Sequence, residues 1–179
     1  MTLEQLKRNV RNVPDFPKKG IQFKDITTII SDPDELRFMR DELTALYRDK
    51  GITKVVGIES RGFILAPAVA IELGAGFVPI RKQGKLPAET IEISYEKEYG
   101  IDFMQIHKDA LSPNDVVLLH DDILATGGSM LAAVELIRKL GVKTIYANCL
   151  IELEGLNGKR FLADRGINCE CLMGIEVDE

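Results

Sequence analysis

VVLLHDDILATGGSM, residues 116–130, joins a strand pattern to a helix pattern through a loop of small residues. Residues 116–120 are mostly β-branched or leucine, a composition typical of a buried strand in a parallel sheet. Two adjacent carboxylates follow, and the turn ATGGS at 125–129 leads into apolar residues at helical spacing up to Leu140. The stretch therefore predicts one strand–loop–helix unit of an α/β fold.

The loop and the start of the predicted helix are suited to bind a phosphate group. Backbone N–H groups in such a turn point towards one spot, and a helix N-terminus adds about half a positive charge. Thr126 and Ser129 supply hydroxyl donors, and the two glycines between them permit close approach of the backbone. Asp121 and Asp122 would repel phosphate, but carboxylates accept hydrogen bonds from vicinal hydroxyl groups. A sugar phosphate would use both features.

Length and composition indicate one globular domain over residues 1–179. The chain is 45% hydrophobic and 28% charged, and its formal net charge of −5 argues against a general nucleic-acid-binding surface. No uncharged apolar run is long enough to span a bilayer, and MTLEQLKRNV lacks the apolar core of a signal peptide. Cys149, Cys169 and Cys171 lack zinc-ligand spacing. We expect a cytoplasmic protein with reduced thiols and no membrane partner.

A second strand–turn–helix pattern covers residues 55–73, with the polar turn Glu59-Ser60-Arg61-Gly62 between strand and helix. In a parallel sheet both turns would lie at the carboxyl ends of strands, where such folds bind ligands. A cation at a helix start opposes the helix dipole, and a bound anion would remove that conflict for Arg61. A surface salt bridge is the alternative explanation.

The rest of the chain continues the alternation of strands and helices. A capping box at Thr2–Gln5 begins a short helix, and residues 15–26 read as an irregular segment in which Phe16 fills the core. Further elements are expected in this order: a helix at 33–47, a strand at 76–81, a hairpin of 91–95 with 101–106, a strand at 144–152, a helix at 159–165 and a strand at 169–173.

Five segments of this chain resemble motifs of the type I phosphoribosyltransferases. The 116–130 stretch is similar to the family's signature for phosphoribosyl pyrophosphate (PRPP), and Glu59–Gly62 resembles its pyrophosphate loop. Three more segments are similar to motifs of the adenine-specific branch: DFPKKGIQFKD at 15–25 in the N-terminal hood, RKQGKLP at 81–87, and SYEKEYG at 94–100 in the catalytic flap. The resemblance runs through nearly the whole chain and implies an open, mainly parallel twisted α/β sheet with helices on both faces.

The resemblance also implies roles for residues at the sugar-phosphate end of the site. Asp121 and Asp122 would hold the ribose hydroxyls. The 5′-phosphate would bind the loop formed by Ala125, Thr126, Gly127, Gly128 and Ser129. The pyrophosphate would be held by Glu59, Ser60, Arg61, Arg81 and Lys85.

For the base, the resemblance implies a sandwich between Phe23 and Ile123, with main-chain groups of Gln22 and Lys24 reading the purine edge. Gln22 stands where the family more often has an apolar residue. Glu98 would handle a proton or stabilise charge, and Tyr99 would cover the site. A solvated turn is the alternative explanation for Glu98.

The implied activity is transfer of the 5-phosphoribosyl group from PRPP to adenine, giving AMP and pyrophosphate in purine salvage. Mg²⁺ would act mainly through PRPP and water instead of a dedicated protein site, and a homodimer is expected. The hood would occupy residues 1–30 and the flap residues 84–106. Two alternatives stay open: a phosphoribosyltransferase for hypoxanthine, guanine or xanthine, and a non-catalytic PRPP-binding regulator, although no DNA-binding module is visible in the sequence.

Overall fold

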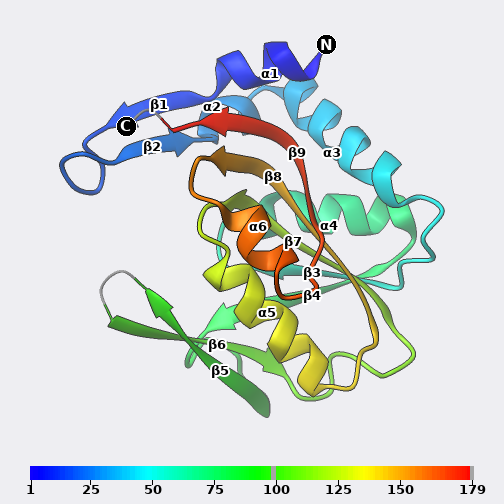
Figure 1. Cartoon of the computed structure of the whole chain (residues 1–179). Helices are drawn as coiled ribbons and strands as arrows, with labels where there is room; N and C mark the ends of the chain where they lie inside the picture. The colour runs from blue at the N-terminus through cyan, green and yellow to red at the C-terminus, as the bar shows by residue number, and fades with distance from the viewer. Residues whose placement is uncertain (98–99, 178–179) are drawn as a thin grey trace.

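A mainly parallel seven-stranded sheet, ordered β5-β6-β4-β3-β7-β8-β9, forms the centre of the computed structural model, which describes residues 1–97 and 100–177 (Figure 1). Adjacent strands pair in parallel from β4 to β9, whereas β6 is antiparallel to both β4 and β5. The strands are β3 (Lys54–Ile58), β4 (Gly76–Lys82), β5 (Thr90–Lys97), β6 (Gly100–His107), β7 (Val116–Leu124), β8 (Thr144–Glu154) and β9 (Cys169–Glu176). The predicted sheet class is confirmed.

Helices cover both faces of this sheet, as predicted. Side chains of α1 (Leu3–Asn9), α2 (Thr27–Ile30), α3 (Pro33–Tyr47) and α4 (Gly62–Leu73) share one apolar cluster with one face. Side chains of α5 (Gly128–Lys139) and α6 (Gly158–Ala163) share the second cluster with the other face. Val55 and Val56 of β3 enter opposite clusters, which explains why this strand is apolar throughout.

The N-terminal hood differs from the sequence prediction, because it contains a two-stranded antiparallel ribbon. In this ribbon β1 (Arg11–Pro14) pairs with β2 (Gln22–Asp25), and Val13 lies opposite Phe23. The prediction that Phe16 fills the core is wrong, since its side chain is 50% exposed beyond the end of the ribbon. Strands this short carry too few residues for a clear alternation of polar and apolar side chains.

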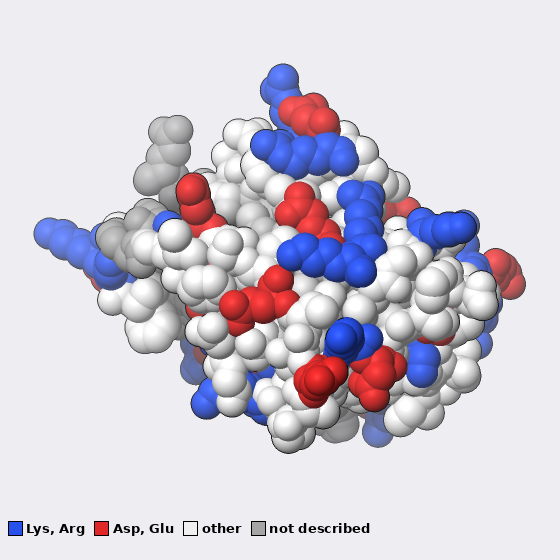
Figure 2. Space-filling model, turned by 90° about the horizontal axis from the view of Figure 1, so that it is seen from below, with Lys and Arg blue, Asp and Glu red and all other residues white. Residues whose placement is uncertain are grey.

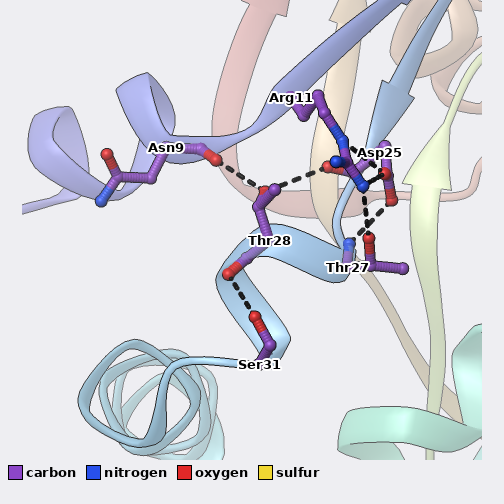
Figure 3. Close-up of polar contacts among 6 residues, drawn as sticks. All are labelled: Asn9, Arg11, Asp25, Thr27, Thr28 and Ser31. Carbon is purple, nitrogen blue, oxygen red and sulfur yellow. Dashed lines mark hydrogen bonds and ion pairs between the residues drawn. The ribbon is translucent and has the colours of Figure 1, made fainter.

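Polar contacts hold the elements of the hood together (Figure 3). Arg11 Nη2 lies 2.5 Å from Asp25 Oδ2, and the Thr28 hydroxyl donates to the Asn9 carbonyl at 2.6 Å. Hydrogen bonds from Thr27, followed by the one from Arg11, lower the pKa of Asp25 to about 2. Asp25 therefore stays ionised at neutral pH and ties the two hood strands to α2.

The flap is a hairpin that is joined to the sheet over a short distance. Strands β5 and β6 pair continuously from Thr90–His107 to Lys97–Gly100. By contrast, β6 pairs with β4 only at Arg81–Gln105 and Lys82–Met104. The hairpin therefore starts at Thr90, later than the predicted flap boundary at residue 84, and it projects away from the sheet (Figure 1).

Figure 2 shows the face seen from below the view of Figure 1, where Lys and Arg side chains are interleaved with Asp and Glu side chains. Charges of the two signs are thus mixed on this face. No helix within residues 1–97 and 100–177 has the length and apolar character needed to cross a bilayer.

Candidate active site

A phosphate-sized cradle lies where β7 passes into α5. The strand extends to Leu124, so that Asp121 and Asp122 lie inside it instead of after it. Gly127 is the N-cap residue of α5 with a φ of 91°, a conformation that glycine adopts without strain. Among the described residues, no side chain caps this helix start. Its first backbone N–H groups are therefore available to an anion. A cavity of about 220 Å³ is lined by Arg61 and residues 121–130.

The two acids have different surroundings. Asp122 is 5% exposed, and its Oδ2 lies 2.6 Å from Arg61 Nε. Asp121 is partly exposed, and its Oδ1 accepts a hydrogen bond from the Asp122 backbone at 2.9 Å. Burial, followed by the charge of Asp122, raises the pKa of Asp121 well above its ordinary value. Asp122 is thus an ion-paired carboxylate, whereas the surroundings of Asp121 disfavour its charged form.

Gly62 allows the start of α4 to lie against these acids. A Cβ atom at this position would come within 3.0 Å of the His120 carbonyl oxygen and 3.1 Å of Asp121 Oδ1. Glycine therefore keeps the turn before α4 close to β7, and the second predicted turn adjoins the first.

Arg61 joins the cradle to the hood. Besides its ion pair with Asp122, its guanidinium carbon lies 5.2 Å from the ring centroid of Phe23. The side chain remains 43% exposed, so it is reachable from solvent. The cation at the helix start is thus balanced by a buried acid, in contrast to the surface salt bridge considered from the sequence.

The turn before Arg61 is fixed by contacts within the protein. The Glu59–Ser60 peptide bond is cis. The Glu59 carboxylate accepts from Arg81 Nη2 at 3.1 Å and from the Lys82 backbone at 2.8 Å. Burial alone would raise the pKa of Glu59, but the Arg81 and Lys82 hydrogen bonds outweigh it and lower that pKa. Arg81 also donates to the Lys85 carbonyl at 3.3 Å, so it holds the loop together.

A second cavity, of about 300 Å³, separates this turn from the flap. It is lined by Ile58, Glu59, Ser60, Arg61, Lys82, Tyr95, Lys97, Asp121, Asp122 and Ser129. Asp102 holds the lysines of this cavity, because it is hydrogen-bonded to Lys97 and lies 3.7 Å from Lys82 Nζ. The Lys97 hydrogen bond is the main cause that lowers the pKa of Asp102 to about 2. Two cations thus border a cavity that also contains Arg61.

A third and larger cavity, of about 850 Å³, lies between hood, flap and cradle. Its lining residues are Pro17, Lys18, Gly20, Ile21, Gln22, Glu96, Lys97, Ala125, Thr126, Gly128, Ser129, Leu153, Leu156 and Val177. Most of its exposed surface is apolar. A space of this size and character, next to the phosphate cradle, can take a flat heterocycle.

Residues of β2 contact β1 and Arg61, and of this strand Gln22 is among the lining residues of the largest of these cavities, whereas Phe23 and Lys24 are not. The Phe23 ring packs edge-to-face on Phe16, with centroids 5.1 Å apart, and faces Arg61. Gln22 Oε1 accepts from Asn12 Nδ2 at 2.7 Å, and Lys24 Nζ donates to Asn12 Oδ1 at 3.0 Å. Asn12 therefore fixes the side chains on both sides of Phe23.

Comparisons with known proteins agree with this geometry. The family model described as "Phosphoribosyl transferase domain" matches residues 30–173. A curated adenine phosphoribosyltransferase of Bacteroides fragilis is 57% identical over 176 residues, covering 98% of this chain and 99% of its own. One from Bacteroides thetaiotaomicron is 60% identical over 164 residues, covering 92% and 93%.

The chain belongs to the phosphoribosyltransferase family. Its structure is also similar to that of the APRTase from Giardia lamblia complexed with 9-deazaadenine, with a TM-score of 0.94, 46% identity and 98% of each chain covered. The adenine phosphoribosyltransferase structure from Thermoanaerobacter pseudethanolicus gives a TM-score of 0.92 at 41% identity, covering 97% of this chain and 100% of the other. These similarities place the chain among the adenine phosphoribosyltransferases.

In this phosphoribosyltransferase the structure brings together most residues that the sequence singled out. Glu59, Ser60, Arg61, Asp121, Asp122 and Ser129 line one cavity. Ile123, Ala125, Thr126, Gly127 and Gly128 line the cradle beside it. Arg81 and Lys85 are not among the lining residues of either cavity. Glu98 and Tyr99 fall outside the residues that the structure describes, so their roles stay predictions.

Lys82, Tyr95 and Lys97 are cavity residues that the sequence analysis missed. The alternation of side chains along the strands could have identified them, because Lys82 follows Val78 and Ile80 on the side of β4 that faces α5. Tyr95 and Lys97 similarly continue the inward series of Ile91 and Ile93 on β5. Arg81 lies on the other side of its strand, so alternation separates it from Lys82.

Proposed function

We propose that this phosphoribosyltransferase transfers the 5-phosphoribosyl group from PRPP to adenine, producing AMP and pyrophosphate for purine salvage. The full-length similarity to curated adenine phosphoribosyltransferases supports this reaction. The structural observation that carries it is the pair of acids beside the uncapped start of α5, with Arg61 at 2.6 Å from Asp122. This arrangement offers separate contacts to a phosphate, a pair of ribose hydroxyls and a leaving anion.

The substrate halves are assigned by charge. The 5′-phosphate would accept hydrogen bonds from the backbone of Ala125–Ser129 and from the Thr126 and Ser129 hydroxyls. Asp121 and Asp122 would accept from the ribose hydroxyls. The pyrophosphate would lie in the cavity bordered by Arg61, Lys82 and Lys97, with Lys85 and Arg81 as further candidates at its outer edge.

The chemistry needs charge stabilisation more than a covalent nucleophile. As C1′ leaves the pyrophosphate oxygen and approaches N9 of adenine, the ribose carries positive charge, which the nearby aspartates stabilise. Arg61 and the flap lysine stabilise the charge that grows on the leaving pyrophosphate. Closure of the flap excludes water from the ribosyl cation, with Tyr99 as its cover and Glu98 as a candidate acceptor of the N9 proton.

Magnesium fits this site through its substrate. Within the described part of the chain no group of three or more His, Cys, Asp or Glu residues is placed to hold a metal ion. Bound pyrophosphate, ribose hydroxyls and water would supply the oxygen ligands that Mg²⁺ prefers, and Asp121 and Asp122 would hold the ribose hydroxyls in place. When bound, Mg²⁺ makes pyrophosphate a better leaving group.

The base would lie where the large cavity meets the cradle, because Gln22 lines the large cavity and Ile123 lines the cradle. Phe23 and Ile123 are the proposed faces of the sandwich, and the main chain of Gln22 and Lys24 the proposed edge contacts. The Arg61 guanidinium carbon lies 5.2 Å from the Phe23 ring centroid, so Arg61 would lie close to a purine stacked on this ring. A cytoplasmic location and a homodimer remain proposals that rest on the family resemblance.

The first expected result concerns base choice. When the protein is mixed with Mg²⁺–PRPP and adenine, hypoxanthine, guanine or xanthine in turn, pyrophosphate release should be efficient with adenine alone. The 6-oxo purines carry an O6 acceptor, and the sequence offers no lysine in the position that other branches direct at O6. Efficient pyrophosphate release with hypoxanthine or guanine would instead support the first alternative, a phosphoribosyltransferase for another purine.

The second alternative, a PRPP-binding regulator, makes a different prediction in the same assay. A regulator would bind PRPP without releasing pyrophosphate with any of the four bases. PRPP binding is therefore measured by calorimetry on the same protein as pyrophosphate release. Binding without release with any base would support the regulator, whereas the absence of both would indicate an inactive preparation.

The flap lysine gives a second expected result. Lys97→Met should raise KM for PRPP about tenfold, since a charge-assisted hydrogen bond to phosphate contributes roughly 1.5 kcal/mol or more. Lys108→Met is the matched control, because Lys108 pairs with Glu89 at 3.8 Å on the exposed surface past the end of β6. Steady-state kinetics checks both variants. Equal KM values for Lys97→Met and the unchanged protein would remove Lys97 from the pyrophosphate site.

A further inference from the structure

The three cysteines lie together on the neighbouring strands β8 and β9, and none of them is among the residues assigned to the reaction. Cys149 of β8 is in register with Cys171 of β9, and Cys169 lies two residues before Cys171 on the same side of the strand. Cys149 is fully buried and Cys169 is 2% exposed, whereas Cys171 on the edge strand is partly exposed. All three thiols are free.

Strand geometry selects one pair for a disulfide bond. Adjacent strands lie about 4.8 Å apart, which is inside the Cα separation of about 4.4–6.8 Å that disulfides require. Cys149 and Cys171 face each other at this spacing. Cys169 is diagonal to Cys149 and about 6.6 Å along the strand from Cys171, so it fits less well with either. The registered pair is therefore the one that can be joined without moving the strands.

The thiols of this cluster differ in pKa. Hydrogen bonds from the Cys149 and Cys169 side chains lower the pKa of Cys171 to about 4; burial opposes this, and the Lys159 charge supports it. Contacts with Cys169 and Cys171, together with burial, raise the pKa of Cys149. Lys159 is held nearby by Glu152 at 3.0 Å. The partly exposed sulfur is thus the nucleophilic one, and a buried thiol waits beside it.

We propose that Cys171 and Cys149 form a peroxide-oxidisable thiol pair that closes into an intrachain disulfide. Cys171 thiolate attacks hydrogen peroxide, breaking the O–O bond; the sulfur becomes a sulfenic acid, and the departing hydroxide takes a proton to become water. The Cys149 sulfur then attacks the sulfenic sulfur, its own proton passes to the departing hydroxyl group, and a second water leaves. Two thiols are oxidised and one peroxide is reduced.

The bond would form next to the cradle, because Cys149 is also in register with Asp121 on β7. It is nevertheless detected without any activity measurement. A failure of this proposal would therefore leave the proposed reaction untouched, and a failure of the reaction would leave the thiol chemistry testable.

The test counts thiols in the full-length protein. Reduced protein is treated with a few equivalents of hydrogen peroxide, unfolded in the presence of a thiol-alkylating reagent, and analysed by mass spectrometry. We expect the number of alkylated cysteines to fall from three to one, and the tryptic peptides 144–159 and 166–179 to be recovered as one linked species without reduction. Three alkylated cysteines, or links between two chains only, would overturn the proposal.

Serine variants assign the pair. Cys169→Ser should still form the linked peptide, whereas Cys171→Ser should keep both remaining thiols. In Cys149→Ser, the Cys171 sulfenic acid should persist and react with a dione probe. Thermal melting of each variant confirms that it is folded before oxidation. A linked peptide in Cys171→Ser, or its loss in Cys169→Ser, would show that the wrong pair was chosen.

Discussion

The double variant Asp121→Asn/Asp122→Asn is expected to lower kcat/KM for PRPP by about 10²–10⁴-fold. A hydrogen bond to a charged group contributes roughly 1.5–3 kcal/mol, and two are weakened together, at about 1.4 kcal/mol for each factor of ten. The loss should exceed what either single variant shows, since each remaining acid can still accept from one ribose hydroxyl. Pyrophosphate release at varied PRPP concentrations measures the effect.

Two further variants make this prediction specific. Asp34→Asn is the matched control, because Asp34 is an exposed acid on α3 that pairs with Arg37 of the same helix at 2.5 Å, and its kcat/KM should stay unchanged. Full activity in the double variant, or an equal loss in Asp34→Asn, would contradict the roles given to the acids.

Asp121→Asn alone should make the protein more stable at neutral pH. Asn Oδ1 can keep the hydrogen bond from the Asp122 backbone, while the charge is removed. Because burial and Asp122 raise the folded-state pKa of Asp121, the native state holds its proton up to a higher pH than the unfolded chain. Stability from this group is present below the unfolded pKa and is lost as the pH rises through the folded pKa. The Tm advantage of the variant should therefore shrink on acidification.

Arg61→Met is expected to lower kcat about 10²–10³-fold. A positioned donor at a developing negative charge contributes roughly 2.7–4 kcal/mol to the transition state, and methionine keeps the length of the side chain without its charge. The substitution also leaves Asp122, which is 5% exposed, without its ion pair, so the Tm should fall as well. Single-turnover kinetics with saturating PRPP separates the chemical step from binding.

The control for Arg61 is Arg37→Met, which removes a comparable cation from an exposed helix surface and should change neither kcat nor Tm appreciably. Arg61→Lys tests geometry, because an ammonium group cannot contact Asp122 and a planar anion in the same way as a guanidinium group. A kcat within threefold of the unchanged protein in Arg61→Met would remove Arg61 from the leaving-group site.

The cradle could be predicted from the sequence because its signals are local. A buried strand, two acids and a glycine-containing turn are adjacent in the chain, so their spacing alone places them at one end of a sheet. The length of β7 was harder to predict, because Asp121 and Asp122 look like the start of a loop. In the structure, β7 stays paired with β8 through Asp121–Cys149 and on to Leu124–Glu152. Pairing between strands, which the sequence does not display, decided where that strand ends.

The hood and the cation cavity depended on contacts between distant segments. Phe16 is an aromatic residue of the kind found in cores, but it lies in the turn between β1 and β2. There it is exposed to solvent and packs against Phe23. The cluster of cations at 81–85 drew attention to Arg81 and Lys85, although Arg81 is bound by Glu59 at the end of the neighbouring strand β3. Lys82 and Lys97 could be found from the alternation of side chains along β4 and β5. That alternation can be used only when the bounds of both strands are known.

The short ladder between β4 and β6 has a mechanical consequence. In the described residues, backbone pairing joins the hairpin to the sheet at Arg81–Gln105 and Lys82–Met104, whereas the hairpin itself is paired along its whole described length. The remaining support comes from side chains of the hairpin that pack in the cluster of α5. One of the two backbone pairs belongs to Lys82, a residue of the leaving-group cavity, so an anion bound by Lys82 would act directly at the attachment of the hairpin.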